Sequence, residues 1–148
     1  MRGISFIRNK CDDSIFATIL DGVDVKRLYW NVSEDEVYLS NDDNLFVEKF
    51  IDGNTFLSLI NIDYYMAIFA NIKAYTDNII SNKINYYDDF LKSNCELVIL
   101  CYDSAYFEIY SKSTDIIEII KSNCMKKGFS EIEYITDDND CRTIFSVE

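Results

Sequence analysis

The chain of 148 residues contains no histidine. Nucleophile pairs of the Ser-His or Cys-His type are therefore excluded, and so are metal sites built on imidazole. The residue types left for acid–base chemistry are Asp, Glu, Tyr, Lys and Cys, among which paired carboxylates are the natural general acid and base. The absence of histidine thus narrows the reactions open to this protein more than any other feature of its composition.

Glycine and cysteine patterns exclude further classes of site. The four glycines stand far apart at Gly3, Gly22, Gly53 and Gly128, so the chain has no glycine-rich loop of the kind that cradles phosphates. The five cysteines are an odd number without a close CxxC pair, which argues against a disulfide framework and against a zinc knuckle. We therefore expect no cofactor and no metal, and thiols that pack as small hydrophobic groups.

Basic residues are few, and long apolar runs are missing. Fourteen basic against 26 acidic residues give a net charge of −12, which opposes attraction to phosphate backbones and to anionic lipid surfaces. We expect no nucleic acid and no membrane as partner, whereas a basic protein, or no partner, fits the charge. No run of about 18 apolar residues and no charged-then-apolar leader occurs, so a cytoplasmic location is expected.

The hydrophobic residues, 49% of the chain, are sufficient for one core, and we expect a single globular domain over 1–148. Alternating patterns predict strands, and helical spacing with capping residues predicts helices. The strands are expected near 1–7, 28–32, 37–40, 46–51, 64–75, 96–102, 105–110, 132–135 and 143–147. Two main helices are expected at 12–21 and 113–127, with short ones near 55–60 and 86–92. The fold class is therefore α+β, with a mostly antiparallel sheet.

The stretch 95–110, CELVILCYDSAYFEIY, gathers many reactive side chains. Its two halves are too apolar on both faces for half-solvated strands, and Asp103-Ser104 between them suits a two-residue turn. Cys95 and Cys101 share a strand face but stand roughly 20 Å apart, so they cannot chelate one ion together. We predict a hairpin at the middle of the sheet rather than a reactive site.

Several stretches carry a resemblance to a known family. They are RGISF at 2–6, LYW at 28–30, IFANIKAY at 68–75, YDDFLKSNCELVILCYD at 87–103, GFSEIEYIT at 128–136, and RT at 142–143. Through them the chain resembles a family of uncharacterised proteins from low-GC spore-forming bacteria, catalogued as domain of unknown function 2691. The resemblance covers nearly the whole chain and implies a single domain. It implies no reaction, cofactor or catalytic residue.

Tyrosines cluster in the second half of the chain and support the first functional hypothesis. A phenol combines apolar area with a hydrogen-bonding tip, which suits a core boundary or an interface. An amphipathic acidic face could be formed on the central hairpin by Tyr102, Tyr106, Tyr110, Glu96 and Glu108. Such a face would complement a basic protein, as in inhibitor or immunity-type proteins. This hypothesis is a non-enzymatic protein-binding or regulatory module.

Two other hypotheses stay open. Asp88, Asp89 and Asp103 could converge in an aromatic cleft of a small-molecule-binding or hydrolytic domain. The same carboxylates also suit a helix first turn and a tight turn, so we assign no catalytic residue and favour a protein that is not an enzyme. A structural role through self-association is the third hypothesis, because apolar hairpins leave edges that a symmetric dimer can pair. A monomer and a homodimer both fit the sequence.

Overall fold

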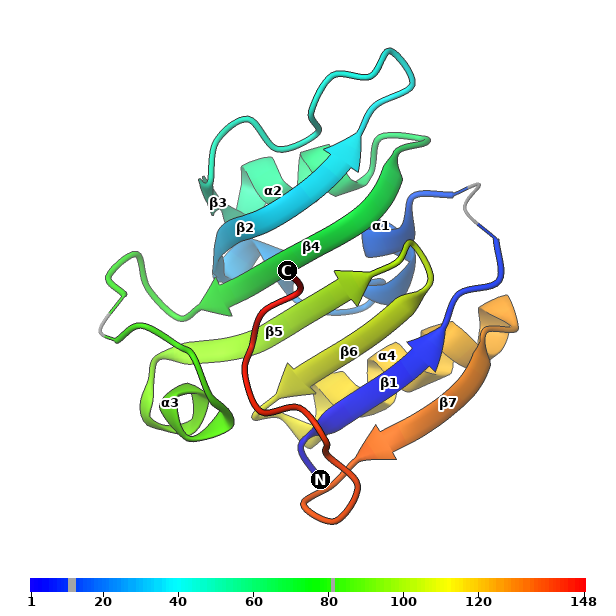
Figure 1. The fold of residues 1–148 in the computed structure, drawn as a ribbon. Coiled ribbons are helices and arrows are strands. Elements are labelled where there is room, and N and C mark those ends of the chain that lie inside the picture. Colours follow the sequence, from blue (N-terminus) through cyan, green and yellow to red (C-terminus); the bar gives the residue numbers. More distant parts are fainter. Residues whose placement is uncertain (11–12, 81) are drawn as a thin grey trace.

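A computed structural model describes residues 1–10, 13–80 and 82–148 and shows one twisted sheet with helices (Figure 1). The described strands form a seven-stranded sheet in the order β3-β2-β4-β5-β6-β1-β7, and each neighbouring pair is antiparallel. The strands are β1 Gly3–Ile7, β2 Tyr29–Tyr38, β3 Phe50–Asp52, β4 Met66–Tyr75, β5 Cys95–Tyr102, β6 Tyr106–Ser111 and β7 Ser130–Ile135. The helices are α1 Ile15–Ile19, the 3-10 turn η1 Val25–Arg27, α2 Gly53–Ile60, α3 Tyr87–Lys92 and α4 Thr114–Lys127. The predicted α+β class with a mostly antiparallel sheet is confirmed.

The two faces of the sheet are covered by different parts of the chain. Helices α1, α2 and α4 cover one face, here called the back face, where the larger core is built around side chains such as Trp30, Ile72 and Ile117 (Figure 1). The opposite, front face carries α3 and the chain that follows β7, and its smaller core includes Leu100 and Phe145. The residues after β7, 136–148, are called the C-terminal segment below. They run across the front of the sheet and place residues far apart in sequence against the central strands.

The central hairpin confirms the interpretation of the stretch 95–110. β5 is the middle strand, and it pairs with β6 in the register Tyr102 opposite Tyr106. The two turn residues, Asp103 and Ser104, have φ values of 51° and 61°, as a type I′ turn requires. Away from the turn the apolar side chains are buried, from Leu97 to Cys101 on β5 and at Phe107, Ile109 and Tyr110 on β6, because helices lie behind the hairpin and the C-terminal segment lies in front of it (Figure 1).

Helix α4 follows the predicted capping pattern. The Ser113 hydroxyl accepts a hydrogen bond from the amide of Ile116 at 3.3 Å, and Gly128 ends the helix with φ 71° in the left-handed region. The helix predicted at 113–127 carries an apolar stripe of Ile116, Ile120 and Cys124, which is buried against the sheet. Among the helices of the described residues, none is both long and apolar enough to span a lipid bilayer.

Two strand predictions are wrong. The predicted strands at 28–32 and 37–40 are one strand, because β2 runs from 29 to 38 through the acidic stretch 33–36 and keeps pairing with β4 through a bulge at which Glu34 has φ 44°. The predicted strand at 143–147 does not form either, since this part of the C-terminal segment leaves the sheet edge and packs on the front face. Both errors arise from partners distant in sequence, β4 in one case and the front face in the other.

The first helix is shorter than predicted, and part of its predicted start, Asp12, lies outside the described residues, as does Cys11. Ser14 stands at the N-cap position, but its hydroxyl makes no capping hydrogen bond and donates to the carbonyl of Ile62. Of the other four cysteines, Cys95, Cys101 and Cys124 are buried, as predicted. Cys141 is exposed, so the packing prediction is wrong for that thiol.

Candidate functional site

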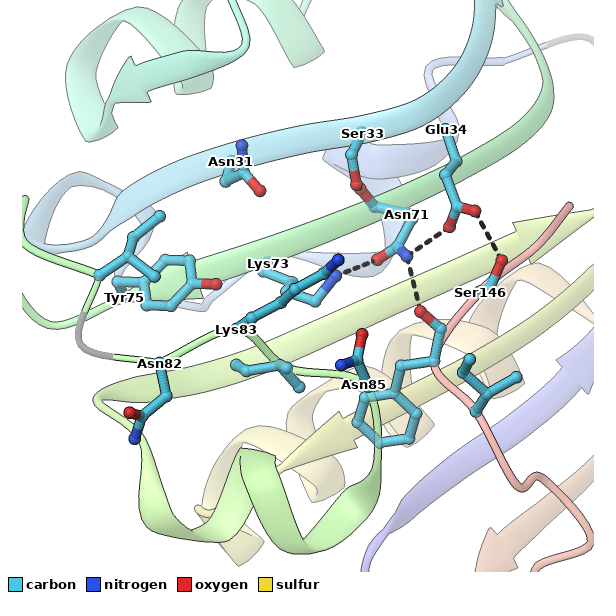
Figure 2. Close-up of a pocket in the computed structure, with 14 residues that line it drawn as sticks. Asn31, Ser33, Glu34, Asn71, Lys73, Tyr75, Asn82, Lys83, Asn85 and Ser146 are labelled. Carbon is cyan, nitrogen blue, oxygen red and sulfur yellow. Dashed lines mark hydrogen bonds between the residues drawn. The ribbon is translucent and has the colours of Figure 1, made fainter.

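A pocket of about 570 Å³ lies on the front face over β2 and β4 (Figure 2). The two strands form its floor, the loop after β4 forms one wall, and the C-terminal segment forms another. Its described lining residues are Asn31, Ser33, Glu34, Asn71, Lys73, Tyr75, Ile80, Asn82, Lys83, Ile84, Asn85, Ile144, Phe145 and Ser146. Polar side chains dominate the floor, which is unusual for the centre of a sheet covered on both faces.

Strand alternation explains why the floor is polar. Asn31 pairs with Lys73 and Ser33 pairs with Asn71 across β2 and β4, so these four side chains project to the same face. Ile72, between Asn71 and Lys73, projects to the back face and joins the larger core. The sequence therefore places one polar row on the front of the sheet without disturbing the hydrophobic back.

Glu34 ties the floor to the C-terminal wall. Its Oε1 accepts a hydrogen bond of 2.7 Å from Asn71 Nδ2, and its Oε2 accepts one of 2.5 Å from the hydroxyl of Ser146. The backbone amide of Val147 also donates to Oε1, at 3.3 Å, and Asn71 Nδ2 donates to the carbonyl of Phe145 at 2.9 Å. Partial burial alone would raise the pKa of Glu34, but these hydrogen bonds outweigh it and the pKa is lowered. Glu34 is therefore a charged anchor whose oxygens are already engaged.

Lys73 is the least ordinary group in the pocket. Its residue surface is only 7% exposed, and its Nζ donates a hydrogen bond of 2.7 Å to Asn71 Oδ1 (Figure 2). Within the described part of the chain it forms no ion pair with a carboxylate. Burial lowers the pKa of Lys73, and electrostatic interactions with Cys95 and Glu34 oppose this only in part. A buried ammonium with one neutral partner keeps hydrogen-bonding capacity for something else.

Other polar groups of the lining add further hydrogen-bond donors to the pocket. Lys83 reaches into the pocket from the loop wall, and the amides of Asn31 and Asn85 and the hydroxyl of Tyr75 lie around the same space (Figure 2). Among the described lining residues Glu34 alone carries a carboxylate. No group of three or more Cys, Asp or Glu side chains placed to hold a metal occurs among the residues described. The pocket is suited to a small polar molecule with at least one acceptor or anionic group.

The five residues of the predicted tyrosine face share the front face of the central hairpin, but they do not form one open surface. Tyr110 is fully buried, its ring centroid is 4.6 Å from that of Phe145, and its hydroxyl donates to Asp140 at 3.0 Å. Glu108 accepts a 2.6 Å hydrogen bond from Arg142 Nε. The C-terminal segment therefore covers this part of the face.

The other three residues of that face lie at opposite ends of the hairpin: Tyr102 on β5 and Tyr106 on β6 flank the turn, and Glu96 is near the start of β5. Tyr102 and Tyr106 stack with ring centroids 5.4 Å apart, and Tyr106 is 42% exposed. Glu96 lies six residues from Tyr102 along the strand, which is roughly 20 Å in extended chain. The structure thus brings Tyr102, Tyr106 and Glu108 together and leaves Glu96 apart, while a binding role for the face stays a prediction.

The three predicted cleft carboxylates are not brought together. Asp88 is exposed on α3, whereas the Oδ2 of Asp89 accepts hydrogen bonds of 3.0 Å from the backbone amides of Asn85 and Tyr86, in the manner of a helix cap. Asp103 is exposed in the turn at the opposite end of β5, roughly 25 Å of strand away. None of the three lines the pocket among its described residues.

Sequence reasoning missed Asn71 and Lys73, although a signal was present. In IFANIKAY they are the polar residues two apart within a long apolar strand, which puts both on one face. A polar row inside a sequence that otherwise predicts a buried strand indicates either a solvated face or a site. The wall that contains Ser146 has no comparable pattern in the sequence, because its position depends on the path of the C-terminal segment across the sheet.

Comparisons with known proteins give a family and no activity. The family model described as "Protein of unknown function (DUF2691)" matches residues 1–146. A curated relative from Bacillus subtilis strain 168, called "Uncharacterized protein YncE", is 32% identical over 152 residues, with 99% of each chain covered. No solved structure matches the chain significantly.

Proposed function

Because the chain belongs to the DUF2691 family of proteins of unknown function, whose curated relative has no assigned activity, we propose a function from the pocket itself. The protein binds a small anionic molecule over β2 and β4 and serves as a non-enzymatic binding or regulatory domain in the cytoplasm. The observation that carries this proposal is Lys73, buried at the floor of a 570 Å³ pocket without a carboxylate partner among the described residues.

The energetics of buried charge support this reading. Removing an ammonium group from water costs several kcal/mol, and proteins usually offset that cost with a paired carboxylate. Here the only carboxylate of the described lining, Glu34, is bound to Asn71, Ser146 and Val147. A ligand carboxylate or phosphate would supply the missing countercharge to Lys73. Lys83 and the pocket amides add donors for the same group.

An NMR titration with inorganic phosphate and with acetate tests the proposal. Amide resonances of the floor, the loop wall and the C-terminal wall should shift together in wild-type protein, and Lys73→Met should abolish the shifts. Lys126→Met, which removes an exposed lysine on α4, is the matched control and should bind like wild type. Shifts scattered over surface lysines, or shifts that persist in Lys73→Met, would remove the proposal.

A second function, binding of a basic protein partner, is favoured by one specific observation. A shallow cleft of about 170 Å³ beside the Tyr102–Tyr106 stack is also lined by Glu131 and Glu133, both exposed on β7. Carboxylates next to aromatic rings suit the lysine or arginine side chain of an inhibitor target or immunity-type partner.

Affinity purification from native cells at low and at moderate salt tests this second function. A basic protein that is retained by wild-type bait at low salt and lost from a Glu131→Gln, Glu133→Gln bait would support it. Recovery of the same proteins by both baits would exclude the cleft as the docking surface.

A further inference from the structure

The surroundings of Lys73 suit a nucleophilic amine. A lysine reacts with a carbonyl carbon only in its neutral form, and a directly bound carboxylate would hold it as ammonium. In this pocket the direct acceptor is the amide oxygen of Asn71, and the carboxylate of Glu34 lies on the far side of that amide. The lowered pKa of Lys73 agrees with this arrangement.

The position of Lys73 is also rigid. It lies on β4, which is paired with β2 on one side and with β5 on the other. The 2.7 Å hydrogen bond to Asn71 fixes the direction of Nζ. A reactive group held on a central strand is better oriented than one on a loop, and the pocket leaves room for a small molecule beside it.

Tyr75 and Lys83 could bind two groups of a carbonyl ligand, its carbonyl oxygen and an anionic group. Tyr75 lies two residues after Lys73 on the same strand and lines the same pocket, and burial raises its pKa, so its phenol remains a proton donor toward a carbonyl oxygen. Lys83 lines the pocket from the loop and has no hydrogen bond or ion pair to another described residue. In a carbonyl ligand Lys83 can hold the anionic group, so that this group does not bind Lys73 directly and does not keep its amine charged.

We propose that Lys73 forms an imine with a small aldehyde or ketone that carries a carboxylate or phosphate group, an assignment that rests on the anion-binding function proposed above. The neutral Nζ attacks the carbonyl carbon, and the new C–N bond gives a carbinolamine. That adduct loses its hydroxyl group and one nitrogen proton as water, which leaves the C=N bond. Amine and carbonyl compound thus give imine and water, with no change of oxidation state and no further reagent.

Reductive trapping with glyoxylate tests this inference. The full-length protein is incubated with glyoxylate and sodium cyanoborohydride, which reduces an imine to a stable secondary amine, and labelled lysines are located by peptide mass spectrometry over time. Lys73 should be labelled several-fold faster than the exposed Lys126. Labelling of Lys73 no faster than Lys126 would overturn the proposal.

Two variants separate covalent reaction from anion binding. Lys73→Arg keeps the positive charge, so the amide resonances of this variant should still shift with phosphate in the NMR titration, but position 73 should no longer be labelled rapidly.

Lys83→Met should slow the labelling of Lys73 by glyoxylate and leave its labelling by neutral acetaldehyde unchanged. Equal slowing with both probes would overturn the assignment of an anionic group to the ligand. A protein that shifts with phosphate but shows no preferential labelling would refute the imine and leave the binding function intact.

Discussion

The hydroxyl of Ser146 donates a 2.5 Å hydrogen bond to the carboxylate of Glu34, which precedes it by 112 residues. The bulge in β2 makes this contact possible, since the positive φ of Glu34 turns its side chain toward the C-terminal segment. Asn71 on β4 binds the other oxygen of the same carboxylate. One side chain therefore joins β2, β4 and the C-terminal segment at the edge of the pocket.

Glu34→Gln should lower the free energy of unfolding at neutral pH by about 1 kcal/mol, because hydrogen bonds to a charged acceptor are replaced by weaker ones at a partly exposed site. The pKa of Glu34 is lowered from 4.5 in the folded state, so its contribution is present above pH 4.5 and is lost as the pH falls through the folded value. Urea denaturation at several pH values should show wild type losing more stability on acidification than the variant. Parallel acid profiles would contradict this account.

Lys73 should affect the free energy of unfolding in the alkaline range, whereas Glu34 affects it in the acidic range. Because the pKa of Lys73 is lowered from 10.5 by burial, wild type becomes more stable as the pH rises from the folded value toward 10.5, and the variant lacks this gain. The stability of Lys73→Met relative to wild type should therefore be greatest at neutral pH and decline in alkali. Lys126→Met, measured in the same denaturation series, should show no such trend, and a trend shared by both variants would count against a buried ammonium.

Phe145→Ala tests how firmly the C-terminal segment is packed. Phe145 is buried, with its ring centroid 4.6 Å from that of Tyr110 and 6.2 Å from that of Phe90. Truncation should cost about 3 kcal/mol of unfolding free energy and should increase hydrogen exchange in β5 and β6. The neighbouring Ile144 is 46% exposed, so Ile144→Ala should cost much less. Similar losses in the two variants would show that the segment is held by something other than Phe145.

Asp88 and Asp89 provide a matched pair on one helix. Asp89→Ala should destabilise the protein by about 1 kcal/mol, because the amides of Asn85 and Tyr86 lose their acceptor. Asp88→Ala should have almost no effect on thermal unfolding, since Asp88 is exposed. Neither change should reduce phosphate binding. A large loss of binding in Asp88→Ala would restore the hypothesis of a carboxylate cleft.

Local patterns were enough to predict much of the fold. The central hairpin followed from two apolar runs around Asp103-Ser104, and α4 from its caps and stripe. The bulge at Glu34 could not be predicted, because four acidic or polar residues in a row favour a turn unless a long partner strand holds both sides. The burial of Tyr110 could not be predicted either, because it also depends on a residue distant in sequence. Tyr110 packs against Phe145, which belongs to no strand.

The candidate site was less accessible to prediction than the fold. Asn71 and Lys73 can be found in the sequence as a polar row on an apolar strand. Their significance depends on Lys83 and Ser146, which come from separate segments and meet only after the sheet has formed. The residues of the tyrosine face do lie on one side of the hairpin, as predicted. The sequence did not indicate that the C-terminal segment packs over part of that face.

The path of that segment also sets an order of events during synthesis. The floor of the pocket lies on β2 and β4, but the wall that contains Ser146 follows all the strands and helices that the structure describes. A ribosome-bound chain can therefore pair β2 with β4 while the pocket is still open on that side. Ligand binding would then distinguish a finished molecule from a partly synthesised or C-terminally clipped one.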